Sequence, residues 1–165
     1  MQKYKLFLKN FDEKLEKYKS SHQAFLCCQK GCSICCEKGE YPISELELKY
    51  LMHGYIELDI STKIKIQENI KNIKKGEKCP FLINNFCSIY EHRPIICRVH
   101  GLAYLCKDNL AKLPYCVNLG KNYKNCYKDN ELLVEPIKDN LETYEVLKDF
   151  DFGPIKNLYD WIKHS

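Results

Sequence analysis

The chain has 165 residues, of which 45% are hydrophobic and 29% are charged, an ordinary balance for a globular protein. This length suits about one domain, large enough to bury a core without covalent cross-links. The net charge of +4, from 26 basic and 22 acidic residues, is too mild to require a nucleic-acid partner. Lysines do alternate with tyrosines at 121–124 and 127–128, but these segments are too short to predict a nucleic-acid interface.

The N-terminal segment, Met1–Lys9, is interrupted by lysines and lacks the apolar run of a signal peptide. No apolar stretch of the sequence approaches the roughly 20 residues that span a bilayer. We therefore expect a cytoplasmic protein without a membrane partner. Nothing in the composition indicates a particular protein partner.

The first predicted element is an N-terminal helix over residues 3–26. Its apolar face carries side chains at steps of three or four residues, namely Phe7, Phe11, Leu15, Tyr18, His22 and Phe25. A histidine on such a stripe is typical of the edge of a core, so His22 is not expected to bind metal.

A cysteine-rich loop follows over residues 27–40, and a capping box opens the next helix. Ser44 and Glu47 have the spacing of an N-cap residue and its partner at the third helical position. Another helix is predicted over 60–74, with its lysines facing solvent. The isoleucines expected to face inward on this helix are Ile60, Ile64, Ile70 and Ile73.

The rest of the chain combines irregular segments with short helices. Prolines punctuate residues 76–126, and we expect helices over 139–150 and 154–163. The predicted fold class is therefore mainly α with irregular loops, in the form of a small metal-stabilised cysteine-cluster domain flanked by helices. We expect one domain over 1–165, with a metal-binding core at 27–120, an N-terminal helix at 3–26 and a C-terminal helical segment at 131–163.

Eleven cysteines set this composition apart. In a reducing cytosol such a set is typical of a metal binder rather than of a disulfide framework, and the odd count would leave one thiol unpaired. The spacing Cys28-x3-Cys32-x2-Cys35 gathers three thiols in a short loop, which lowers the entropy cost of closing them around one ion. Cys36 follows directly, and its side chain leaves the backbone in a different direction. Either Cys35 and Cys36 serve different metals, or one of them is structural.

Three later cysteines are more widely spaced, at Cys79, Cys87 and Cys97. A zinc ion held by four thiolates carries a net charge of about −2, for which a neighbouring guanidinium is a suitable partner. Arg98 directly follows Cys97 and is a candidate for this role. The alternative for Arg93 and Arg98 is an ordinary ion pair, for instance with Glu91.

Two sequence blocks accompany the later cysteines. They are Cys79-Pro80-Phe81-Leu82 and Cys87-x-Ile89-Tyr90-Glu91-x-Arg93-Pro94-x-x-Cys97-Arg98. Together with the cysteine loop, these blocks resemble the YkgJ-type cysteine-cluster family, a CxxCxxCC type also described as a zinc- or iron-chelating domain. The resemblance extends over about residues 27–120, and its blocks occur in the family's order.

The resemblance implies eight metal ligands, which are Cys28, Cys32, Cys35, Cys36, Cys79, Cys87, Cys97 and Cys116. The sequence departs from the family at the last of these, where Cys116-Val117-Asn118 replaces the usual Cys-x-Gly. Cys27, Cys106 and Cys126 fall outside the pattern. Because a free cysteine packs as a small hydrophobic residue, we expect these three to be buried thiols.

The resemblance implies metal binding more directly than catalysis. We expect one or two zinc ions in a structural or chelating role, because enough thiolates are present to close each coordination shell. The alternative is an iron–sulfur protein with a 4Fe–4S cluster, acting in redox chemistry or within a protein-modifying enzyme, as in the larger, methyltransferase-like flagellin lysine methylases. Thiolates suit both metals, so ligand type does not decide between them. No catalytic constellation is recognised, and the sequence assigns no enzymatic activity.

Overall fold

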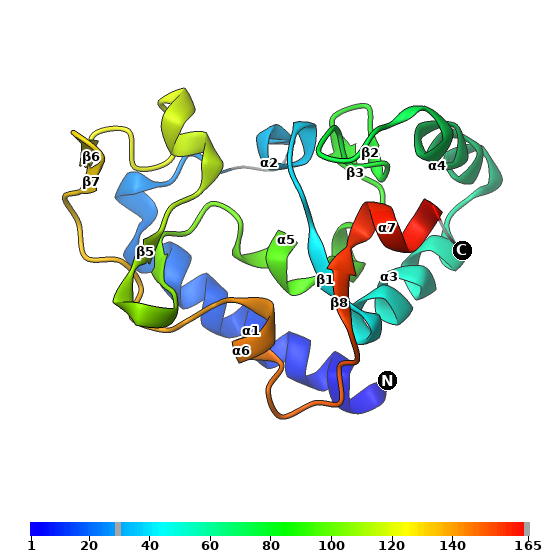
Figure 1. The fold of residues 1–165 in the computed structure, drawn as a ribbon, viewed down its shortest axis with the longest axis horizontal. Helices are drawn as coiled ribbons and strands as arrows, with labels where there is room; N and C mark the ends of the chain where they lie inside the picture. The colour runs from blue at the N-terminus through cyan, green and yellow to red at the C-terminus, as the bar shows by residue number, and fades with distance from the viewer. Residues whose placement is uncertain (29–30, 164–165) are drawn as a thin grey trace. The chain divides into compact units, whose positions relative to one another are not determined.

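Two units divide the chain in the computed structural model, which describes residues 1–28 and 31–163 (Figure 1). Unit 1 consists of Met1–Cys28 and Arg98–Val146, and unit 2 consists of Gln29–Cys97 and Leu147–Ser165. The expectation of a single domain over 1–165 remains a prediction.

The unit boundary falls inside the predicted cysteine loop, since Cys28 belongs to unit 1 and Cys32 to unit 2. Gln29 and Lys30 of that loop lie outside the described residues. No helix in the described part of the chain is both long enough and apolar enough to span a membrane.

Helix α1 (Gln2–Ser21) opens unit 1 and is followed by a 3₁₀ turn, η1 (Gln23–Phe25), so the predicted N-terminal helix is confirmed. Its buried stripe consists of Tyr4, Leu8, Phe11 and Leu15, at steps of three or four residues. The predicted face is therefore right at Phe11 and Leu15, and the burial begins one turn before Leu8, at Tyr4.

Short strands and turns make up the remainder of unit 1. Two hairpins pair β4 (Tyr104–Leu105) with β5 (Ala111–Lys112) and β6 (Tyr127–Lys128) with β7 (Glu131–Leu132). The other elements are the 3₁₀ helices η3 (Lys107–Asn109) and η4 (Tyr115–Leu119) and the helix α6 (Thr143–Val146). A core cluster of this unit consists of Ala103, Val117, Tyr123 and Cys126.

Unit 2 contains the helices α3 (Glu45–Glu57) and α4 (Ile60–Asn72) and a hairpin of β2 (Leu82–Ile83) and β3 (Phe86–Cys87). Its shorter elements are α2 (Ile34–Glu37), the 3₁₀ helix η2 (Tyr90–His92) and α5 (Ile95–Val99), whose last two residues belong to unit 1. In Figure 1, β1 (Pro42–Ser44, cyan) lies antiparallel to β8 (Ile155–Asn157), which leads into α7 (Leu158–Lys163, red). Core residues include Ile43, Leu51, Ile66, Phe81 and Leu158.

The capping box predicted before α3 is confirmed. The Ser44 hydroxyl accepts the backbone N–H of Glu47, and the Glu47 carboxylate accepts the backbone N–H of Ser44 at 2.7 Å. Both residues are fully buried, so this helix start belongs to the core of unit 2.

Helix α4 confirms the helix predicted over 60–74, but part of its predicted inward face is wrong. Ile60 and Ile64 are 77% and 54% exposed, whereas Ile66 is fully buried and Ile70 packs against the same core. Because a helix turns by about 100° per residue, Ile60 and Ile64 point well away from Ile66.

The helix predicted over 139–150 is much shorter in the structure. Only Thr143–Val146 is helical, and the Asn140 side-chain oxygen accepts the backbone N–H of Glu142 at 2.9 Å. Such a side-chain turn competes with the hydrogen bonds of a helix. The fold class is confirmed in its coarse form, because helices predominate over two-stranded sheets among the described elements.

Candidate metal centre

Five cysteines gather in unit 2, and we call Cys35, Cys36, Cys79, Cys87 and Cys97 the unit 2 thiol group. They come from separate pieces of the chain. Helix α2 carries the first two, a turn before β2 carries the third, β3 ends with the fourth, and α5 contains the last. Distant parts of the sequence therefore contribute to one set of thiols, all of which the sequence predicted as ligands.

Backbone hydrogen bonds hold these pieces in position. The Cys79 N–H donates to the Cys36 carbonyl at 2.8 Å, which joins the cysteine loop to the turn before β2. The Leu82 N–H donates to the Cys79 carbonyl at 3.1 Å, and Leu82 pairs with Cys87 across the hairpin. Main-chain hydrogen bonds thus join three of the thiol-bearing segments.

Burial and mutual proximity make these thiols difficult to ionise on their own. Burial raises the pKa of Cys79 to about 12, and the charges of Cys87 and Cys35 act in the same direction. Burial and then the charges of Cys79, Cys87 and Cys35 raise the pKa of Cys97 well above its usual value. A hydrogen bond with the Cys36 thiol, followed by burial, raises the pKa of Cys35. Each thiol is thus close enough to affect its neighbours.

A positive charge opposes this repulsion. Burial raises the pKa of Cys87, and the guanidinium of Arg93 acts against that rise. The same guanidinium favours the ionised forms of Cys35 and Cys97. Its position is fixed by Tyr90, because Arg93 Nε donates to the Tyr90 carbonyl at 2.8 Å and the guanidinium carbon lies 3.4 Å from the centre of the Tyr90 ring.

Arg98, which the sequence proposed as a partner of the sulfurs, has a different role. It is 5% exposed and forms an ion pair with Asp12 of α1, within unit 1. The ion-pair alternative is therefore right for Arg98, with Asp12 rather than Glu91 as the acid. The charge that faces the thiols comes from Arg93, five residues earlier.

The remaining predicted ligands lie elsewhere. Cys32 is exposed in unit 2, whereas Cys28 and Cys116 belong to unit 1. The charges of Cys28, Cys116 and Cys126 all act on the phenol of Tyr123, and we call these three cysteines the unit 1 thiol group. Burial raises the pKa of Tyr123 to about 12, and the charges of the three cysteines add to that rise.

The three cysteines outside the family pattern differ in burial. Cys126 is 7% exposed, as predicted for a buried thiol. The prediction is wrong for Cys27, which is exposed, and Cys106 is only partly buried. Burial of a thiol depends on which loops fold over it, and this is not encoded in the residues next to it.

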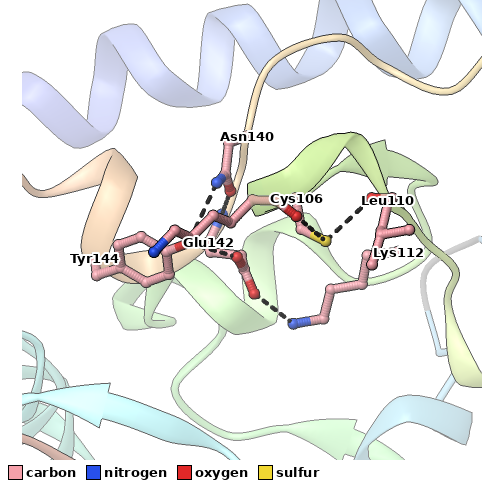
Figure 2. Close-up of polar contacts among 7 residues, drawn as sticks. Cys106, Leu110, Lys112, Asn140, Glu142 and Tyr144 are labelled. Atoms are coloured by element: carbon pink, nitrogen blue, oxygen red, sulfur yellow. Dashed lines mark hydrogen bonds and ion pairs between the residues drawn. The ribbon is translucent and has the colours of Figure 1, made fainter.

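Cys106 takes part in a polar surface network of unit 1 (Figure 2). Its thiol donates to the Leu110 carbonyl at 3.0 Å. Figure 2 also shows Glu142 paired with Lys112 at 3.1 Å and accepting the Tyr144 hydroxyl at 2.9 Å. Cys106 therefore provides a natural control cysteine for experiments on the two thiol groups.

Two histidines of unit 1 lie near the predicted cysteines in sequence. His22 is partly buried, and its Nδ1 lies 2.9 Å from the Tyr123 hydroxyl oxygen, which agrees with a position at the edge of the core. His100 is also partly buried, and burial followed by the charge of Lys112 lowers its pKa to about 4. His100 is therefore neutral near pH 7.

The fit of these residues to a metal depends on the chemistry of the donors. Across residues 1–28 and 31–163, no three side chains of histidine, cysteine, aspartate or glutamate already form a metal-holding group. Thiolate sulfur is nevertheless the donor that zinc and iron–sulfur clusters prefer. Crowded, buried thiols ionise readily only when a cation joins them, so the unit 2 thiol group suits a thiophilic metal.

Comparison with known proteins gives a match over the cysteine-rich part of the chain. The family model CxxCxxCC, described as "Putative zinc- or iron-chelating domain", matches residues 27–136, more than half of the chain. All of the cysteines lie within this range. No curated protein and no solved structure matches the chain. The family match confirms the resemblance indicated by the cysteine spacing.

Proposed function

Because the chain belongs to the CxxCxxCC family of zinc- or iron-chelating domains, we propose that it is a cytoplasmic protein that binds zinc through clustered thiolates. The chain binds one or two ions, and they have a structural or chelating role. The eight cysteines implied by the family remain the proposed ligands, namely Cys28, Cys32, Cys35, Cys36, Cys79, Cys87, Cys97 and Cys116. A reducing compartment keeps such thiols available for metal.

The observation that carries this proposal is the composition of the unit 2 thiol group. Cys35, Cys79, Cys87 and Cys97 supply four thiolates, the number that closes a tetrahedral shell around a structural zinc ion. Four thiolates and one divalent cation leave a net charge of about −2, and the guanidinium of Arg93 partly offsets it. The cation thereby removes the repulsion that keeps these buried thiols protonated.

The donor set supports a structural or chelating role. A catalytic zinc ion keeps one position open for water and uses histidine or carboxylate ligands as well. The unit 2 thiol group consists of sulfur donors alone, and it joins a loop, a hairpin and a short helix. Closing a metal shell with these sulfurs would hold three irregular segments together.

Metal analysis of anaerobically purified protein tests the proposal. We expect stoichiometric zinc and its loss in Cys97→Ser, whereas Cys106→Ser should retain the wild-type content. Iron with inorganic sulfide and visible absorbance would support the iron–sulfur alternative and overturn the assignment to zinc. Protein without stoichiometric zinc or iron under these conditions would overturn metal binding altogether.

A further inference from the structure

The side chain of Asn122 holds the sulfur of Cys28 in a fixed position. Asn122 is 1% exposed, and its amide nitrogen donates to Cys28 Sγ at 3.1 Å and to the Gly101 carbonyl at 2.7 Å. Its amide oxygen accepts the Cys27 backbone N–H at 2.8 Å. One buried amide therefore contacts two separate segments of unit 1, and one of these contacts is with a proposed metal ligand.

The backbone partners of Asn122 determine which end of its amide faces the sulfur. A carbonyl oxygen requires a donor, and a backbone N–H requires an acceptor. Turning the amide over would place its oxygen against the Gly101 carbonyl and its NH2 group against the Cys27 N–H, so two hydrogen bonds would be lost. The group directed at Cys28 Sγ is therefore an N–H donor.

Gly101 allows the sulfur and the amide to lie against the main chain. It has a φ of +94°, and a Cβ added there would lie 2.6 Å from Cys28 Sγ and 2.9 Å from the Asn122 amide nitrogen. Real Cβ atoms do not approach other atoms this closely, so only glycine leaves room for both groups. The sulfur is thus confined by the glycine backbone as well as by the asparagine N–H.

Tyr123, the next residue, joins the same two segments without contacting the sulfur through a hydrogen bond. Its backbone N–H donates to the Phe25 carbonyl at 2.7 Å, and its hydroxyl accepts the Ala103 N–H at 3.0 Å. These bonds should hold both segments in place when the neighbouring asparagine is replaced. The bond from Asn122 to the sulfur is therefore not required to join the segments, and its main effect is on the sulfur itself.

We propose that Asn122 is a positioning residue for metal binding, and that its side-chain N–H holds Cys28 Sγ as an oriented sulfur ligand. The inference rests on the proposed function, which includes Cys28 among the ligands, and it adds a residue that does not itself bind the metal. A thiol sulfur is a weak hydrogen-bond acceptor, whereas a charged acceptor forms a stronger bond. The N–H therefore favours the metal-bound thiolate of Cys28, whose thiol proton has passed to solvent.

Zinc titration of the full chain under anaerobic conditions tests this role. Asn122→Ala should weaken the binding of one zinc ion by about 10–100-fold, the usual effect of removing a partner of a metal ligand. The matched control is Asn118→Ala, at an exposed asparagine of η4, and it should keep the wild-type affinity. Wild-type affinity in Asn122→Ala protein with an unchanged circular dichroism spectrum would overturn the role of Asn122, and the proposed function would stand. A wild type that binds neither zinc nor iron would overturn both.

Cobalt(II) in place of zinc distinguishes an effect on the sulfur from a general loss of structure. A thiolate bound to cobalt(II) gives a charge-transfer band in the near ultraviolet, and the energy of this band falls when a hydrogen bond to the sulfur is removed. Part of the band should therefore move to longer wavelength in Asn122→Ala and stay in place in Asn118→Ala. Identical cobalt spectra of the wild type and Asn122→Ala would contradict the proposal.

A measurement on the unaltered chain covers the case in which Asn122→Ala does not fold. In protein labelled with ¹⁵N, the side-chain amide protons of Asn122 give separate NMR signals, and one of these protons lies in the hydrogen bond to Cys28 Sγ. Its signal should shift downfield when zinc is added, because the acceptor becomes a metal-bound thiolate. If saturating zinc leaves both amide signals of Asn122 unmoved, the proposal is wrong.

Discussion

The carboxylate of Glu47 accepts a 2.7 Å hydrogen bond from the backbone N–H of Ile95, 48 residues later in the chain. The same carboxylate accepts the backbone N–H and the hydroxyl of Ser44, at 2.7 and 2.8 Å. One buried side chain therefore joins the start of α3 to the start of α5, the helix that contains Cys97. The capping box thus positions the unit 2 thiol group as well as beginning a helix.

Replacing Glu47 by glutamine should destabilise unit 2. The amide NH2 would face either the Ile95 N–H or the Ser44 N–H, so one buried donor would lose its acceptor. We expect a loss of about 1–3 kcal/mol in the free energy of unfolding, measured in urea. Hydrogen exchange at the start of α5 should also become faster.

The matched control for this change is Glu45→Gln, at the first residue of the same helix. Glu45 forms an exposed ion pair with Lys49 at 2.7 Å, and such pairs contribute about 0.3–0.5 kcal/mol. Equal losses of stability in the two variants would show that the buried carboxylate has no special role.

Gly101→Ala should displace the side chain of Cys28, because a Cβ at position 101 would lie 2.6 Å from Cys28 Sγ. The new methyl group would overlap both the sulfur and the Asn122 amide, in addition to straining the backbone at a φ of +94°. We expect the Cys28 thiol to be displaced, so alkylation of Cys28 in metal-free protein should become faster. Mass spectrometry of the labelled peptides measures this directly.

Gly120→Ala is the control that separates backbone strain at a positive φ from steric overlap of the new Cβ with its neighbours. Gly120 also has a positive φ, of +64°, but nothing lies within 4 Å of an added Cβ. This variant should cost about 1 kcal/mol of stability without changing the labelling of Cys28. If both alanine variants label Cys28 at the same rate, the close approach at Gly101 does not matter.

Local sequence patterns predicted those features that neighbouring residues determine. The capping box of Ser44 and Glu47 and the core side of α1 at Phe11 and Leu15 both depend on spacings of three or four residues. The cysteine spacing indicated the family, because its motifs are short and ordered. For these features, the preferences of neighbouring residues agree with the structure that they adopt.

Long-range pairing could not be predicted in the same way. The second partner of Glu47 is a backbone N–H in another helix, and the acid that pairs with Arg98 lies in α1. The hydrogen bond from the Cys126 N–H to the Tyr123 carbonyl depends on the unusual backbone of Tyr123, which no propensity predicts. The exposed side of α4 at Ile60 similarly depends on which neighbours pack against the helix.

The neutral state of His100 should make the protein less stable in acid. Burial, followed by the charge of Lys112, lowers its pKa to about 4, whereas an unfolded histidine has a pKa of about 6.5. Below pH 6.5 the unfolded chain therefore binds a proton that the folded chain does not. This contribution to stability is present at pH 7 and is lost as the pH falls, by about 2 kcal/mol at pH 5.

The His100→Gln variant isolates this effect from protonation of the thiols. The difference in unfolding free energy between pH 7 and pH 5 should be about 2 kcal/mol smaller in the variant than in the wild type. Urea unfolding of metal-free protein at both pH values provides the measurement. The same pH dependence in both proteins would mean that His100 titrates normally.

Arg93, which lies just before α5, and Arg98, which lies within it, should have separable effects. Arg93→Gln removes the positive charge that favours ionised Cys35, Cys87 and Cys97, so we expect zinc affinity to fall by about tenfold or more. Arg98→Gln instead leaves Asp12 without its partner, and it should lower the free energy of unfolding with little change in zinc affinity. Competition titrations with a zinc chelator and urea unfolding measure the two quantities. A loss of zinc affinity in Arg98→Gln as large as in Arg93→Gln would reverse the assignment, because it would place the charge that balances the thiolates on Arg98.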